Sequence, residues 1–240
     1  MRRRPLSAMA VGLLAIGLAL LPVGASAQSA TPEDAVSAYV AAIAAGDVDG
    51  ILAASAVDEM ASGFDFQAYA ERVQALIPVT SLAPADYPMY AAMDRYQQAA
   101  LLLGQVRNLA YGLLSDEDID GSVIAPVDAA RIAAFAAAVD PSQLAGLSVV
   151  DDRFPVPDMA TNERYLANAQ AQAAIYGADE LTERLTLVDL DGQTYALGLT
   201  LLRYGDRWLV ASQSSPIAGT SSLGTAEPMT REEFDAQTGG

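Results

Sequence analysis

The sequence predicts one α+β domain in which N-terminal helices pack on a C-terminal antiparallel β-meander. Between residues 31 and 139, apolar side chains recur every three or four residues, as they do along one face of a helix. Between residues 185 and 212, short alternating runs are separated by Asp191-Gly192 and Gly205-Asp206, which are typical turn sequences. We expect residues 28–213 to form a single domain.

Residues 1–27 have the pattern of a secretory signal peptide. Three arginines, Arg2–Arg4, precede an apolar run from Leu6 to Val23, and Ala25 and Ala27 supply the small residues that a signal peptidase prefers. A retained membrane anchor fits less well, because two glycines and a proline interrupt the run. A twin-arginine signal fits less well, because the residues after the arginines depart from its pattern. We expect cleavage before Gln28 and an exported, periplasmic protein, with secretion as the alternative.

The first helix of the mature chain has clear start and stop signals. Thr31 is placed to cap it, Pro32 suits its first turn, and Gly46 suits a left-handed cap at its end. Asp47 is placed to cap a short helical turn that follows. One apolar stripe is formed by residues at helical spacing, namely Val36, Tyr39, Val40 and Ile43.

Three further helices are predicted before residue 146. They span about 66–77, a long segment after Asp86, and about 128–139. The long helix carries large apolar side chains that we expect in the core, since such residues usually serve packing. These are Met89, Met93, Tyr96, Ala100, Leu103 and Leu114.

The last third is predicted to be mainly β. A short strand at 147–150 and a helix at 162–176 precede a three-stranded meander that ends with Arg207–Ser212. Residues 214–240 are rich in Ser, Thr and Gly, so we expect a mostly disordered tail. Within it, Thr230 and Glu233 have the spacing of a capping box for one short helix.

Composition excludes most catalytic apparatus. The chain has no Cys and no His, and all 13 of its basic residues are Arg. Catalytic triads, thiol nucleophiles, Schiff-base lysines and the usual zinc, copper, haem and iron–sulfur ligands are therefore absent from the sequence. Carboxylate, phenol, hydroxyl and Arg chemistry remains. We predict no cofactor.

The charge of the chain limits its partners. The net charge is −17, and loss of residues 1–27 would leave 10 Arg against 30 acidic residues. Such a chain repels nucleic acid and anionic membrane surfaces, so we predict neither as a partner after signal cleavage. A small apolar ligand or a protein partner is expected instead, with no particular oligomeric state predicted.

Both ends of the mature chain resemble the NTF2-like superfamily. The resemblance rests on Pro32–Tyr39 with Gly46-Asp47, and on Asp191-Gly192 with Tyr204–Val210, about a third of the mature chain. It implies helices on a curved sheet with a cone-shaped pocket between them. Residues 64–146 depart from the pattern, because they are mostly helical and longer than the family usually places there, which leaves either a large helical insertion or a different fold. Enzymes of the family commonly use His, Asp or Tyr inside the cone, but none of those positions can be matched here.

An acidic segment between two predicted helices resembles the start of a calcium-binding loop. Asp116, Asp118 and Asp120 occupy positions 1, 3 and 5, and Gly121 occupies position 6. Position 12 is Val127, where a bidentate Glu should complete the coordination. We therefore favour a solvated acidic loop at 116–128 and keep calcium binding as the alternative. At Asp189-Leu190-Asp191-Gly192 a hairpin turn explains the residues better than a metal.

These observations favour an exported, non-catalytic accessory or binding domain. Its site would be an NTF2-like pocket or the acidic helical surface. The alternative is a small NTF2-like enzyme that uses Asp and Tyr for acid–base chemistry. Nothing singles out a pair of carboxylates among the 30 acidic residues. A pocket with one or two convergent acids or tyrosines would favour the enzyme.

Overall fold

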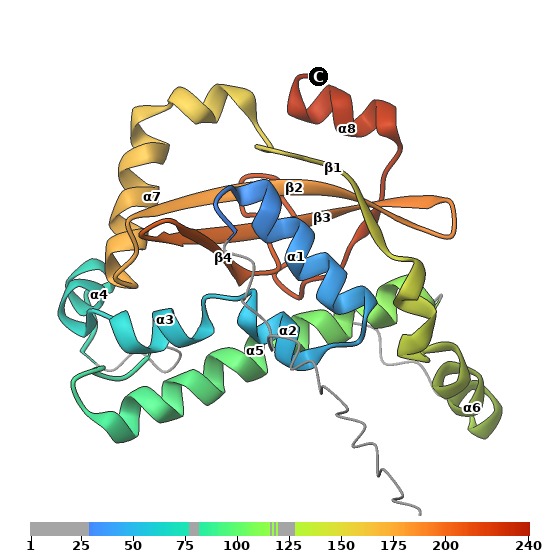
Figure 1. Ribbon diagram of the computed structural model, residues 1–240, viewed down its shortest axis with the longest axis horizontal. Helices are drawn as coiled ribbons and strands as arrows, with labels where there is room; N and C mark the ends of the chain where they lie inside the picture. Colours follow the sequence, from blue (N-terminus) through green and yellow to red (C-terminus); the bar gives the residue numbers. More distant parts are fainter. Residues whose placement is uncertain (1–28, 77–81, 116, 118, 120–127) are drawn as a thin grey trace, which may run out of the picture.

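The computed structural model describes residues 29–76, 82–115, 117, 119 and 128–240 (Figure 1). Within the described residues, six helices between Pro32 and Ala138 precede the sheet. The predicted α+β class is confirmed. The first helices are α1 (Pro32–Ala44), α2 (Val48–Ala53), α3 (Val57–Gly63), α4 (Phe66–Val73), α5 (Pro88–Leu114) and α6 (Ala129–Ala138). Two 3₁₀ segments follow at Pro141–Gly146 and Pro157–Thr161, and the last helices are α7 (Glu163–Ile175) and α8 (Arg231–Thr238). The predicted signal peptide, residues 1–27, lies outside the described residues.

Side-chain caps fix the starts of several helices where the sequence predicts them. The Thr31 hydroxyl accepts a hydrogen bond from the Asp34 amide, and Asp47 and Asp65 cap α2 and α4 in the same way. The helix expected at 66–77 is too long. Gln74 adopts a left-handed conformation with φ of 56°, which ends α4 at Val73.

The sheet is antiparallel, in the order β1-β2-β3-β4. The predicted meander is confirmed as β2 (Glu180–Leu190), β3 (Gln193–Tyr204) and β4 (Arg207–Ser212), and β1 (Ser148–Arg153) adds a fourth strand beside β2. A short β5 (Glu227–Pro228) pairs with the start of β3. Asp191 and Gly192, with φ of 54° and 86°, make the tight turn between β2 and β3.

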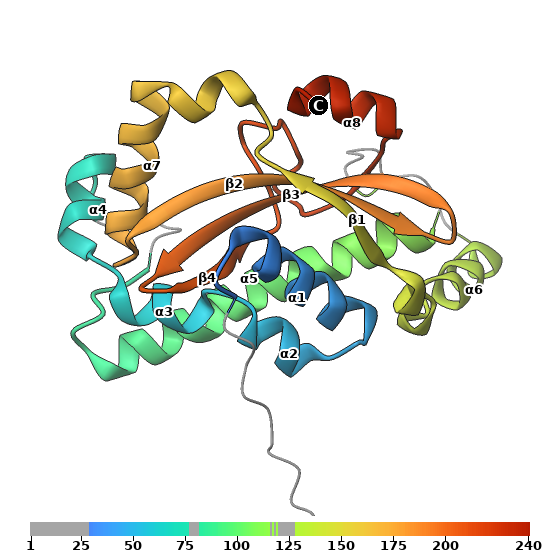
Figure 2. The same ribbon diagram turned by 45° about the horizontal axis from the view of Figure 1, so that its top comes forward.

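Both faces of the β2–β3 hairpin are buried (Figure 2). On one face, α1, α2 and α5 form the main core with the sheet. Its fully buried side chains include Val36, Tyr39 and Ile43 from α1, Leu109 from α5 and Leu197, Leu199 and Leu201 from β3. On the opposite face, α7 covers one end of the sheet and α8 covers the other.

The prediction that residues 214–240 form a mostly disordered tail is wrong. α8 places Phe234, which is fully buried, on Leu185, Leu187 and Ala196. The predicted capping box is confirmed, with Thr230 and Glu233 satisfying each other's backbone amides. A side chain at Gly198 would collide with Thr220, so the segment after β4 packs directly against the sheet. Apolar burial on the second face therefore orders a segment whose own composition is that of a tail.

The expected burial of the first half of α5 is also wrong. Met89, Met93 and Tyr96 are 65%, 59% and 70% exposed, whereas Leu102 and Leu109 further along the helix are buried. The first half of α5 extends beyond the sheet, where α3 packs against the helix. Helical periodicity identifies an apolar face, but only the position of the helix decides whether that face is covered.

Replacing Phe234 with Ala should lower the free energy of unfolding by about 3–5 kcal/mol, because it empties a fully buried position between α8 and the sheet. Urea denaturation of the chain from Gln28 onward would measure the change. Glu232→Ala, at an exposed position of the same helix, should change stability by less than about 0.5 kcal/mol. Equal, small effects of both substitutions would contradict a docked α8.

Candidate functional site

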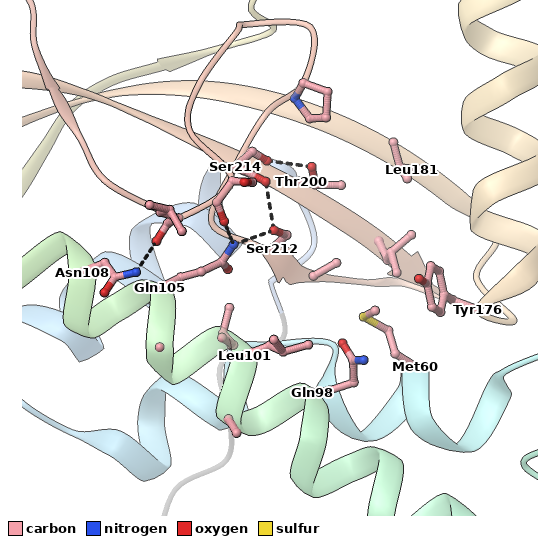
Figure 3. Close-up of a pocket in the computed structure, with 18 of the residues that line it drawn as sticks. Met60, Gln98, Leu101, Gln105, Asn108, Tyr176, Leu181, Thr200, Ser212 and Ser214 are labelled. Carbon is pink, nitrogen blue, oxygen red and sulfur yellow. Dashed lines mark hydrogen bonds between the residues drawn. The ribbon is translucent and has the colours of Figure 1, made fainter. Parts of the chain in front are cut away.

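A cavity of about 550 Å³ lies between α5, α7 and the second face of the sheet (Figure 3). The segment after β4 closes one side of it, and α3 contributes Met60. Its lining is mainly apolar and neutral polar: Met60, Gln98, Ala100, Leu101, Leu102, Gly104, Gln105, Arg107, Asn108, Gln172, Tyr176, Leu181, Thr200, Leu202, Ala211, Ser212, Ser214, Pro216, Ser222 and Leu223. The described residues of the acidic segment at 116–128 do not line this cavity.

One end of the cavity is built from hydrogen-bonded polar groups. The Gln105 amide donates to the Ser212 hydroxyl at 3.1 Å and to the Ser222 carbonyl at 3.0 Å. Asn108 donates to the Leu223 carbonyl at 2.9 Å. These bonds hold the segment after β4 against α5 and so form a wall of the cavity (Figure 3).

Gln213 holds the same wall from behind. Its side-chain amide donates to the carbonyls of Gln105 and Gly224, and its oxygen accepts from the Tyr39 hydroxyl at 3.0 Å. Its backbone amide donates to the Gln105 side chain at 2.9 Å. Burial raises the pKa of Tyr39 far above its usual value, so this phenol stays neutral and keeps the hydrogen bond. The wall is fixed by satisfied buried polar groups.

The other end of the cavity is mainly apolar. Leu181 comes from the sheet, Met60 from α3 and Tyr176 from the residue after α7, with Gln98 of α5 beside Met60 (Figure 3). Leu101, midway along the cavity, is 59% exposed, so the cavity is open to solvent. Burial raises the pKa of Tyr176, which keeps its hydroxyl protonated near neutral pH.

The lining offers binding groups and no acid–base pair. Among the described residues that line it, there is no carboxylate, and Tyr176 supplies the only phenol. A general acid or base needs a group that gains and loses a proton near the working pH, and a buried phenol with a raised pKa does not. The side-chain amides of Gln98 and Gln172 make no hydrogen bond within the described structure, so they are free to meet a ligand.

Comparison with known proteins assigns no function. No family model and no curated protein matches this chain. Among solved structures, the chain is similar to a cystatin-like protein from Ruminococcus gnavus ATCC 29149, with 21% sequence identity and a TM-score of 0.46. The match covers 76% of this chain and 40% of that protein, so the chain spans less than half of its length. The NTF2-like assignment stays a prediction.

A second concentration of charge lies where α1 meets the sheet. Arg184, only 9% exposed, donates to Asp152 at 2.8 Å and to Glu33 at 2.5 Å. The Thr186 hydroxyl donates to the other oxygen of Asp152 at 2.7 Å. Burial raises the pKa of Asp152, although the charge of Arg184 and the bond from Thr186 oppose that change. Every charge here has a partner, so the cluster fastens α1 to β1 and β2.

The calcium-loop candidates Asp116, Asp118 and Asp120 lie outside the described residues. Glu117, between them, is described and pairs with Arg131 of α6 at 2.5 Å, which lowers the pKa of its carboxyl. Among described residues, no group of three acidic, His or Cys side chains is placed to hold a metal ion. In the hairpin turn, Asp189 accepts a hydrogen bond from the Gly192 amide at 3.2 Å, which is a turn contact.

Removing Arg184 should destabilise the fold, because it leaves the carboxylate of Asp152 buried without its counter-charge. We expect Arg184→Met to cost about 3–5 kcal/mol in urea denaturation at pH 7. The double variant Arg184→Met/Asp152→Leu should recover most of that loss, since both buried charges are then gone and Glu33, whose side chain is half exposed, remains solvated. A double variant no better than the single one would show that the cluster acts by packing and not by charge.

Calcium should leave the melting temperature of the chain from Gln28 onward unchanged, because the loop at 116–128 lacks the closing Glu ligand. Thermal unfolding with EDTA and then with millimolar calcium measures this, since an ion that binds only the folded state raises the midpoint. A rise that disappears in Asp118→Ala would overturn the solvated-loop interpretation and identify Asp116, Asp118 and Asp120 as a metal loop.

Proposed function

We propose that the chain is an exported, non-catalytic binding domain that holds a small, largely apolar ligand between α5, α7 and the sheet. The observation that carries this proposal is the cavity of about 550 Å³, whose lining combines apolar side chains with free amides. Ligand-binding pockets usually span about 300–1,000 Å³, with apolar walls and a few orienting polar groups. No helix within the described residues has the length and apolar character needed to cross a membrane.

The position of the cavity differs from the one that the NTF2-like resemblance implies. In the family resemblance, the ligand lies in a cone between the sheet and its helices. Here α1 packs side chains such as Tyr39 and Ile43 against one face of the sheet. The cavity lies on the opposite face, between α7 and the segment after β4. The proposal therefore assigns the ligand to that face.

The enzymatic alternative gains no support from the lining. Acid–base chemistry by Asp and Tyr needs a carboxylate within reach of the ligand. Glu183, a buried acid on β2, already accepts from the Ser215 hydroxyl at 2.6 Å and from the Ile217 amide at 3.0 Å. Glu183 therefore holds the segment after β4 in place. It is not among the described residues that line the cavity. A protein partner on the acidic helical surface stays a prediction.

Gly104 offers a way to block the cavity without harming the fold. It lies in the middle of α5, and a Cβ added there would meet no atom within 4 Å. We expect Gly104→Leu to weaken binding of the neutral fluorescent probe N-phenyl-1-naphthylamine by at least about tenfold, the ratio that a loss of about 1.4 kcal/mol produces. Its melting temperature should rise by a few degrees, since Gly costs a helix about 0.5–1 kcal/mol.

Gln97→Leu is the matched control, because it adds the same side chain to the exposed surface of the same helix, outside the lining. It should leave probe affinity unchanged. Fluorescence titration measures both variants. A wild-type chain that does not bind the probe, or a Gly104→Leu variant that binds it as tightly as the wild type, would contradict a binding role for this cavity.

A further inference from the structure

One charged side chain lines the cavity among the described residues, and it is positive. Arg107 comes from the second half of α5, and every other lining side chain is neutral. The chain as a whole carries a net charge of −17. An exposed arginine beside a partly apolar cavity, in so acidic a chain, gives that cavity a local preference for anions.

Arg107 has no partner within the described structure. Apart from Arg107 and Arg164, each arginine described there makes an ion pair or a side-chain hydrogen bond. Arg107 thus keeps its whole guanidinium fork available, in a protein where acidic residues are abundant enough to pair nearly all the others. A free fork binds a carboxylate through two parallel hydrogen bonds.

Neighbouring groups at the same end of the cavity also have donors to spare. Asn108 uses one amide hydrogen on the Leu223 carbonyl, and its second hydrogen has no partner. The Ser222 hydroxyl, held nearby through the bond from Gln105 to its carbonyl, is also uncommitted. Asn108 follows Arg107 directly on α5, so its amide is a further donor for an anionic group at this end of the cavity.

The two ends of the cavity therefore differ in chemistry. Along α5, Gln98 and Arg107 are nine residues apart, which is about 14 Å at the rise of an α-helix. Leu181 and Met60 belong to the end away from Asn108 (Figure 3). A ligand that satisfies both ends is a linear amphiphile with an apolar chain and an anionic head.

We propose that this ligand is a medium-chain carboxylic acid, whose carboxylate is bound by Arg107 and whose chain lies towards Leu181. The inference rests on the proposed function of the cavity. A single carboxylate matches the single positive charge. A phosphate monoester carries up to two negative charges, and the second would remain uncompensated in a protein of this acidity.

Calorimetric titration with decanoate and with decan-1-ol at pH 7.5 tests the inference. The wild type should bind decanoate about tenfold more tightly than the alcohol, since a hydrogen bond between two charged groups is stronger than one to a neutral hydroxyl. Arg107→Gln should abolish that preference and leave binding of the alcohol unchanged. Arg164→Gln removes the other unpaired arginine, which does not line the cavity, and should change neither affinity.

The outcomes separate the two proposals. If both probes bind and Arg107→Gln leaves their affinity ratio unchanged, the carboxylate inference is wrong and the binding cavity stands. Equal binding of both probes by the wild type leads to the same conclusion. If neither decanoate, decan-1-ol nor N-phenyl-1-naphthylamine binds the wild type, the proposed function fails together with the inference.

Discussion

Burial of the β2–β3 hairpin on both faces is the constraint on which the rest of the structure depends. Nearly every residue from Leu181 to Leu202 outside the turn is buried or half-buried, so the hairpin needs cover on two sides. α1 and α5 cover one face, and α7 and α8 cover the other. A sheet with one solvated face would have left the C-terminal segment without a docking surface. Here the C-terminal segment packs on the apolar second face.

Gln213 holds the segment after β4 in place, so that this segment forms a wall of the cavity. It bonds to α1 through Tyr39, to α5 through Gln105, and to its own segment through Gly224. A buried amide whose partners are all in place costs little, but a missing partner would leave polar atoms unsatisfied in the core. The segment after β4 therefore has one low-energy position. That position leaves a gap between it and α7, and the gap is the cavity.

Most arginines of this acidic chain are held in ion pairs, both in the interior and at the surface. Inside, Arg184 is enclosed by Asp152 and Glu33, and its role is to hold α1 on the sheet. At the surface, Arg153 and Arg231 share Asp151 and tie β1 to α8. These arginines are committed to structure. Arg107 is left uncommitted at the cavity, where a ligand can supply the missing charge.

The sequence by itself determined the features that depend on neighbours in the chain. Caps such as Thr31 and Thr230, the Asp191-Gly192 turn and the alternation along the strands act over a few residues, and they predicted the α+β class. Composition alone removed thiol, imidazole and lysine chemistry. Only the tertiary structure decided which apolar faces are covered. Phe234 is buried because distant strands pack against it, and Met89 is exposed because no distant segment among the described residues covers it. A local sequence pattern does not contain this information. The cavity belongs to the same class, since its lining spans residues 60 to 223 and exists only once those segments meet.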